Sequence, residues 1–204
     1  MIENSDQLSR RGRPPLAVAE SHAEILDAVY ELLLGQSVRD LTIEAVAKRA
    51  KVGKPTLYKW WPTKAALVLA MFRERIAATA IPPVTIGETA EEAIRSAAVA
   101  LIRAFSGPLG KISAELIAEG QSEPAIIHEW YNEFIRYRRA ANAADIERGK
   151  ASGELVAQAN PELVIDAVFG AIWYRLLFRS APLTDQFGID LVTQVFSGVK
   201  ARSS

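Results

Sequence analysis

Apolar residues recur at helical spacing along almost the whole chain, and this periodicity is the strongest constraint on its fold. Between residues 21 and 34 the apolar positions follow the pattern i, i+1, i+4, i+5, i+8, which places them on one face of a helix. No segment alternates polar and apolar residues with a sustained period of two, and no internal repeat is present. The sequence therefore predicts an all-α protein of about nine helices. Ser21 and Glu24 have the form of a capping box at the start of the first helix.

The composition fits a folded, soluble protein. The 204 residues carry 24 basic and 24 acidic side chains, and half of the chain is apolar. The lack of cysteine excludes disulfides, thiolate catalysis and cysteine-based metal sites, and it suits a reducing compartment. The longest stretch without a charged residue, 76–87, is too short for a membrane span and contains two prolines. Because the first residues also lack the pattern of a secretory signal, we expect a cytoplasmic protein without membrane contact.

A short helix, a glycine-containing turn and a second short helix are predicted between Thr42 and Trp61. Thr42 is a good N-cap for the first helix, and Gly53 interrupts the helical pattern. Pro55 suits the first turn of the second helix, and Pro62 ends it because the residue before a proline avoids helical geometry. This arrangement is typical of a helix-turn-helix.

The same segment is strongly basic. Six cations and one acid lie between Glu44 and Lys64, although the whole chain is neutral. The start of a recognition helix enters the major groove, where lysine can meet guanine and a threonine methyl can meet thymine. Tyr58 and Thr42 suit phosphate oxygens. The side chains expected at this exposed start are Lys54, Thr56, Tyr58 and Lys59. A solvated lysine-rich face on a generic helical hairpin is the alternative interpretation.

Two runs, LTIEAVA at 41–47 and GKPTLYKWWPTKAAL at 53–67, resemble the N-terminal domain of TetR-family transcriptional regulators. The resemblance implies a homodimer that binds a partly palindromic double-stranded DNA operator, usually as a repressor, and that a small-molecule effector releases. We accordingly expect a flexible basic arm at 1–19, a helix-turn-helix domain at 20–66 and an effector-binding and dimerisation domain at 67–204. The family's DNA-contacting positions correspond to Thr42, Lys54, Pro55, Thr56, Tyr58, Lys59 and Lys64.

Two residues depart from the family pattern. Gly53 stands where relatives often have a serine, which removes one side chain that could contact a phosphate. Trp60 stands where His, Arg or Tyr is frequent, so its DNA contact would be apolar or an indole N–H to a phosphate. Trp61 matches an aromatic position that packs inward, and we expect it in the core.

An arginine-rich arm precedes the first helix. Arg11 and Arg13 flank a glycine and are followed by two prolines, which favour an extended chain that can lie close to DNA. Narrow A·T-rich minor grooves concentrate negative potential and attract such arginines. A disordered basic tail is the alternative, and the sequence does not favour either interpretation.

The last two predicted helices are unusually apolar. The helix at 161–180 is apolar around most of its circumference, and the helix at 185–200 carries a broad apolar stripe. Such helices are either central to a large core or shared with a second subunit. We expect a homodimer interface, and burial within one chain is the alternative. The predicted interface residues are Val168, Ile172, Leu176, Val192, Val195 and Phe196.

A group of large apolar residues lies between the predicted DNA-binding and dimerisation segments. Ordinary core packing is the alternative for each of them. If they surround a cavity, we expect an apolar or aromatic effector, with polar contacts from Tyr131, Asn132 or indole N–H groups. The candidate lining residues are Phe72, Ile76, Phe105, Leu116, Ile127, Trp130, Tyr131, Phe134 and Trp173. Arg136, Arg138 and Arg139 are expected on the outer face of the helix that begins at Pro124.

The sequence holds no constellation typical of an enzyme. Glu115 and Glu119 are one helical turn apart and could hold a metal with His128, although an exposed polar face explains that spacing more often. There is no phosphate-binding glycine loop and no nucleophile elbow. We therefore predict no catalysis, no cofactor and no metal. The alternative to a DNA-binding regulator is a helical small-molecule-binding or partner-binding protein without operator binding.

Overall fold

The computed structural model describes residues 16–77 and 89–200, and for residues 16–21 it describes the backbone alone. Its helices are α1 (Leu16–Gly35), α2 (Ile43–Arg49), α3 (Lys54–Trp60), α4 (Lys64–Ala77), α5 (Ala90–Phe105), α6 (Pro108–Ser122), α7 (Pro124–Trp130), the π-helical turn η1 (Tyr131–Ile135), α8 (Arg136–Ala151), α9 (Pro161–Phe178) and α10 (Asp185–Ser197). Since α7, η1 and α8 run on without a break, these residues form nine helical rods, and the predicted all-α class is confirmed. The predicted arm with Arg11 and Arg13 lies outside the described residues.

The short helices begin where the sequence predicts. Thr42 caps α2, because its Oγ1 accepts a hydrogen bond from the backbone N–H of Ala45 at 3.1 Å. Gly53 caps α3 without a side-chain hydrogen bond. The predicted capping box at Ser21 is wrong, because α1 already begins at Leu16 and Ser21 lies inside the helix.

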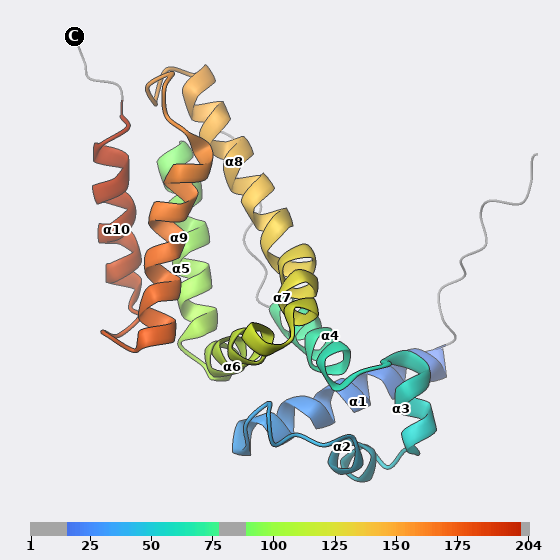
Figure 1. Ribbon diagram of the computed structural model, residues 1–204. Helices are drawn as coiled ribbons and strands as arrows, with labels where there is room; N and C mark the ends of the chain where they lie inside the picture. The colour runs from blue at the N-terminus through green and yellow to red at the C-terminus, as the bar shows by residue number, and fades with distance from the viewer. Residues whose placement is uncertain (1–15, 78–88, 201–204) are drawn as a thin grey trace, which may run out of the picture.

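Helices α1 to α4 form a head at one end of the molecule, as Figure 1 shows. Leu33 of α1, Val46 of α2 and Leu57 of α3 are almost completely buried in its core. The same apolar core continues into α6 and α7, where Ile112 and Trp130 belong to it. Because one core crosses from the head into the rest of the chain, the two parts are packed together and not merely linked.

Helices α5, α9 and α10 lie side by side, and α8 runs from α7 along α5 and α9, on the side away from α10 (Figure 1). They share a second core with α8. Gly188 brings α10 close to α5, because a Cβ at this position would lie 2.8 Å from Cδ1 of Ile102. Such a distance is shorter than side chains tolerate, so a larger residue at 188 would require the end of the Ile102 side chain to shift.

Four of the six predicted interface residues belong to this second core. Val168, Ile172, Val192 and Phe196 are 0% exposed within a single chain, so their side chains cannot contact a second subunit. Their prediction as interface contacts is wrong, because the alternative, burial within one chain, holds for them. The two remaining residues, Leu176 and Val195, are partly buried against the same core.

Candidate nucleic-acid interface and ligand cavity

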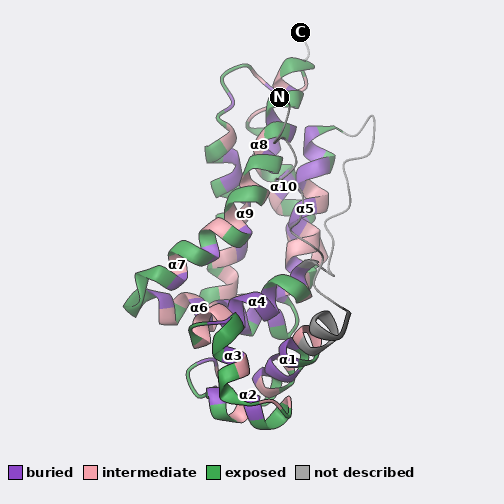
Figure 2. Cartoon of the chain, turned by 90° about the vertical axis from the view of Figure 1, so that its right-hand side faces the viewer, coloured by how far each residue is buried: buried purple, intermediate pink, exposed green. Residues whose placement is uncertain are grey.

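Helix α3 presents a polar and aromatic face to solvent, visible on the outside of the head in Figure 2. Leu57 anchors the helix in the core, and Trp61 directly after it is also buried, as predicted. Thr56 is partly buried, whereas Thr42 at the start of α2 is exposed. The exposed residues of α3 are Lys54, Pro55, Tyr58, Lys59 and Trp60. One helix thus carries most of the residues predicted to contact DNA.

Lys54 is paired with Glu44 in the free protein. Nζ of Lys54 donates a hydrogen bond to Oε1 of Glu44 at 2.7 Å, and both side chains are largely exposed. This hydrogen bond lowers the pKa of the Glu44 carboxyl and raises the pKa of the Lys54 ammonium. Exposed ion pairs contribute little to stability because water competes for both partners. A DNA acceptor can therefore replace Glu44 as the partner of Lys54.

Lys64 holds the connection between α1 and α2. Its Nζ donates hydrogen bonds to the backbone oxygens of Val38 and Arg39, both at 2.9 Å. The sequence indicated a DNA contact for Lys64 but did not predict these hydrogen bonds to the α1–α2 connection. Since an ammonium group carries three protons, one remains for a phosphate oxygen.

Aromatic rings support the end of α3. The ring of Trp61 stacks on His22 with 4.4 Å between centroids, and Trp60 meets the same histidine edge-on at 4.8 Å. Trp60 stays 41% exposed, and Lys59 Nζ lies 5.4 Å from its ring centroid. Burial lowers the pKa of His22, while the nearby carboxylate of Glu74 opposes the shift. A neutral His22 therefore stands behind the exposed Trp60.

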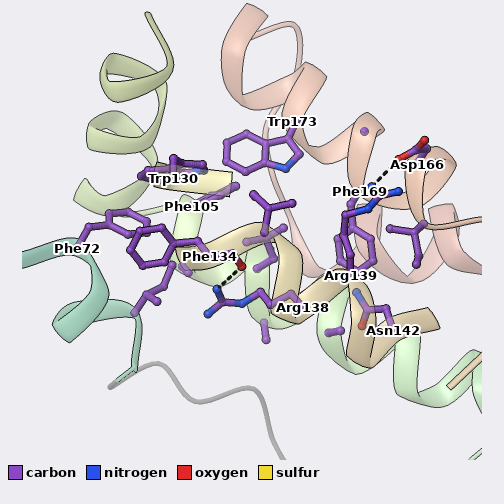
Figure 3. Close-up of a pocket in the computed structure, with 18 residues that line it drawn as sticks. Phe72, Phe105, Trp130, Phe134, Arg138, Arg139, Asn142, Asp166, Phe169 and Trp173 are labelled. Atoms are coloured by element: carbon purple, nitrogen blue, oxygen red, sulfur yellow. Dashed lines mark hydrogen bonds and ion pairs between the residues drawn. The ribbon is translucent and has the colours of Figure 1, made fainter. Parts of the chain in front are cut away.

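An apolar cavity of about 280 Å³ lies between α4, α5, α8 and α9. Figure 3 shows aromatic rings and the guanidinium groups of Arg138 and Arg139 among its lining side chains. The predicted residues that line the cavity are Phe72, Ile76, Phe105, Trp130, Phe134 and Trp173. The prediction missed a second set, which includes Ala97, Leu101, Ile135, Arg138, Arg139, Asn142, Asp166 and Phe169.

Three predicted lining residues lie elsewhere, and their prediction is wrong. Leu116 is 1% exposed and belongs to the core shared with the head. Ile127 packs on Gly120, where a Cβ would lie 2.5 Å from its Cγ1. Tyr131 points outward and is 46% exposed. All three share the helical spacing of the lining residues, but that spacing does not distinguish a cavity from a core or a surface.

The wider turn η1 explains how polar residues reach the cavity. In an α-helix, residues four apart drift by about 40° around the axis at each step. A π-helical turn takes up roughly one additional residue, which offsets much of this drift. Trp130, Phe134, Arg138 and Asn142 are spaced four apart across η1, and all four line the cavity. The expected outward position of Arg138 is therefore wrong, and so is that of Arg139, which also lines it.

Helix α6 connects the cavity region to the head. Its side chains contact the α1–α2 connection in three places: Lys111 Nζ donates to the backbone oxygen of Gln36 at 2.7 Å, Glu115 accepts from the backbone N–H of Val38 at 2.8 Å, and Glu119 pairs with Arg39 at 3.5 Å. Glu115 and Glu119 thus bind the head, not a metal with His128.

In the described part of the chain, no group of three or more His, Asp or Glu residues is placed to hold a metal ion. None of the described helices has the length and apolar character needed to cross a membrane.

Two family models match the chain. The model of bacterial regulatory proteins of the tetR family matches residues 25–71, which correspond to the head. The model of the tetracyclin repressor-like C-terminal domain matches residues 87–195, which include α5, α8 and α9 around the cavity.

Individual relatives agree with these matches over the full length. The uncharacterized HTH-type transcriptional regulator YdeS of Bacillus subtilis (strain 168) is 35% identical over 196 residues, covering 96% of this chain and 97% of that protein. The regulator Rv1556 of Mycobacterium tuberculosis (strain ATCC 25618 / H37Rv) is 28% identical over 204 residues, covering 100% of both chains. The crystal structure of the TetR family transcription regulator SCO0332 superimposes with a TM-score of 0.71 at 32% identity, covering 89% of this chain and 100% of that chain.

Proposed function

This chain belongs to the TetR family and is a DNA-binding transcriptional regulator, not an enzyme, and we propose that it is a homodimeric repressor released by a small molecule. The observation that carries the proposal is the exposed row of Lys54, Tyr58 and Lys59 on α3. A helix held from behind by a buried Leu57 can enter the major groove as a rigid unit. Such a regulator works where the chromosome is, which supports a cytoplasmic location.

The residues of the head have different tasks in this proposal. Lys54 exchanges Glu44 for a guanine edge and so reads a base. Thr42, Tyr58 and the remaining proton of Lys64 contact phosphates and fix the register of the head on DNA. The family's further contact positions, occupied here by Pro55, Thr56, Lys59 and Trp60, complete the interface.

A second copy of the chain would cover an apolar face that the protomer leaves open. Large apolar side chains exposed together on one pair of helices mark an interface in many proteins. The exposed apolar residues on α9 and α10 are Leu163 (66%), Tyr174 (56%), Leu177 (42%), Phe178 (70%) and Ile189 (36%). A twofold axis through this face would place the same patch on both subunits and present two heads to a palindromic operator. The partner contacts proposed here replace the four core residues of the sequence-based prediction.

The cavity is the proposed effector site. Phe72 and Ile76, near the C-terminal end of α4, line it, whereas Lys64 begins the same helix and holds the α1–α2 connection. A ligand that displaces Phe72 would therefore move α4 relative to α1, α2 and α3 and change the distance between the two recognition helices. A coupling free energy of about 1–3 kcal/mol lowers operator affinity roughly 5–150-fold.

The test is selection of bound sequences from a random DNA pool, followed by gel-shift titration of the selected site. Lys54→Ala should relax the preference at one position of each half-site and cost about 1–3 kcal/mol of binding free energy. Lys150→Ala, on α8 and paired with Glu147, is the matched control and should bind as the parent does. An intact dimer without preference for any sequence would contradict operator binding and favour a helical ligand-binding or partner-binding protein.

A further inference from the structure

One cation in the cavity wall has no acidic partner. Arg138 lines the cavity, and among the described residues no carboxylate pairs with it. Its Nη1 donates to the backbone oxygen of Phe134 at 3.0 Å, and its other N–H groups make no hydrogen bond to any described residue. The neighbouring Arg139 also lines the cavity, but it is bound to Glu162 and, at 2.6 Å, to Asp166. Within the described part of the chain, Arg138 therefore lines the cavity without an ion pair of its own.

The position of Arg138 makes this charge unfavourable in the empty cavity. Burial lowers the pKa of its guanidinium group, although arginine stays protonated in proteins. A partly buried cation surrounded by apolar side chains gains most from an anion that can accept its parallel N–H donors. A carboxylate has the geometry that matches this planar group.

Two buried polar groups accompany Arg138. Asn142, one turn further along α8, lines the cavity and is 8% exposed. Nε1 of Trp130 is buried, and it has no hydrogen-bond partner among the described residues. Figure 3 shows Arg138 between Phe134 and Asn142 along one wall. Buried polar atoms without partners are rare in proteins, so the indole N–H of Trp130, with the amide of Asn142 in the same lining, points to a ligand with a polar end.

We infer that the cavity binds a small apolar monocarboxylate whose carboxylate pairs with Arg138 and accepts from Asn142, while its body contacts the aromatic wall. A volume of about 280 Å³ is near the lower limit of drug-sized pockets and suits a one- or two-ring acid or a medium-chain acid. A doubly charged phosphate would leave one negative charge buried without a partner, which disfavours it. This inference rests on the proposed function in one respect, because it names the chemistry of the effector at that same cavity.

The experiment compares acids with neutral amides of the same shape. Isothermal titration calorimetry of the full-length protein would use naphthalene-2-carboxylate and naphthalene-2-carboxamide, with octanoate and octanamide as the aliphatic pair. We expect a carboxylate to bind roughly ten- to a hundredfold more tightly than its amide, because hydrogen bonds to charged partners are the stronger ones. The aromatic and aliphatic pairs then distinguish a ring system from an alkyl chain as the body of the ligand.

Variants assign the preference to one side chain. Arg138→Met should remove the preference for the acid and leave amide affinity unchanged, whereas Arg138→Lys should keep a reduced preference because the charge remains without its planar geometry. Arg136→Met is the control on the same helix, since Arg136 is exposed and lies outside the cavity. The lysine variant still tests the inference if the methionine variant does not fold.

Each outcome decides the inference separately from the proposed function. Amides that bind as tightly as acids, or dissociation constants weaker than about 1 mM for all four probes, overturn the acid site. The acid site is also overturned if an amide releases operator DNA and the acids do not. That result would still support the proposed function, a repressor released by a ligand. Acids that bind through Arg138 without changing operator affinity support the acid site and contradict the effector mechanism.

Discussion

The carboxylate of Glu115 on α6 accepts a hydrogen bond from the backbone N–H of Val38, with 2.8 Å between the two atoms. Val38 follows α1 and is 2% exposed, and its backbone oxygen in turn accepts from Lys64 on α4. One residue of the head is thus held from both α6 and α4. Because α4 also lines the cavity, Val38 lies where movement of either helix reaches the head.

Glu115→Ala should destabilise the chain by about 1–3 kcal/mol, because it leaves the N–H of Val38 buried without an acceptor. Glu115→Gln retains an oxygen that can accept this hydrogen bond, so its free energy of unfolding should fall much less. Urea unfolding followed by circular dichroism measures the free energy of unfolding for both variants. Glu119→Ala is the control, since its partner Arg39 is 82% exposed and such pairs contribute little. Similar losses for Glu115→Ala and Glu119→Ala would contradict the role of Glu115.

The outer face of α9 should carry the dimer contact. Tyr174→Glu places a charge in the proposed interface, and we expect monomers with unchanged helix content by light scattering and circular dichroism. Tyr137→Glu is the matched control, because Tyr137 is 64% exposed but belongs to α8, outside the proposed interface helices α9 and α10. Ile172→Glu should instead unfold the protomer, since Ile172 is completely buried within it. A Tyr174→Glu protein that stays dimeric would place the interface elsewhere.

Local sequence signals predicted the head well, and longer-range competition explains where they failed. Thr42, Gly53 and Pro62 each act on the backbone next to them, so the bounds of α2 and α3 follow from the sequence. Ser21 has the local chemistry of a cap as well. The residues 16–20 before it, however, favour helix strongly enough for α1 to begin earlier.

The cavity and the interface depend on which side of a helix meets which neighbour. Helix α9 is apolar around most of its circumference, so its pattern could not separate Ile172, which is buried in the second core, from Tyr174, which is exposed. Arg138 was expected outside because charged residues usually mark the exposed face of a helix. The π-helical turn before it changes the register, and a period of 3.6 residues does not predict such a turn.

Stability should depend on pH through His22. Burial lowers the pKa of His22, whose ordinary value is about 6.5. Below that value the unfolded chain binds more protons than the folded chain, so the free energy of unfolding falls as the pH decreases. Above that value, the contribution of neutral His22 to stability is fully retained. From about pH 7.5 to about pH 5.5, the free energy of unfolding should fall more for the parent than for His22→Phe. The phenylalanine keeps an aromatic ring on Trp61. His128→Phe serves as the control because His128 is exposed, and it should behave as the parent does.

Lys64 should affect both stability and DNA binding, which separates it from the other lysines of the head. Lys64→Met removes two hydrogen bonds from a charged donor, and we expect a loss of about 1–3 kcal/mol in the free energy of unfolding. If its third proton meets a phosphate, the slope of log affinity against log salt should also fall by about one contact. Lys59→Met changes an exposed lysine that makes no hydrogen bond in the described structure, so it should alter DNA affinity without changing stability. Equal unfolding free energies for the parent and Lys64→Met would show that the bonds to Val38 and Arg39 contribute nothing measurable. Lys64 would then act on DNA alone, as its position in the sequence first indicated.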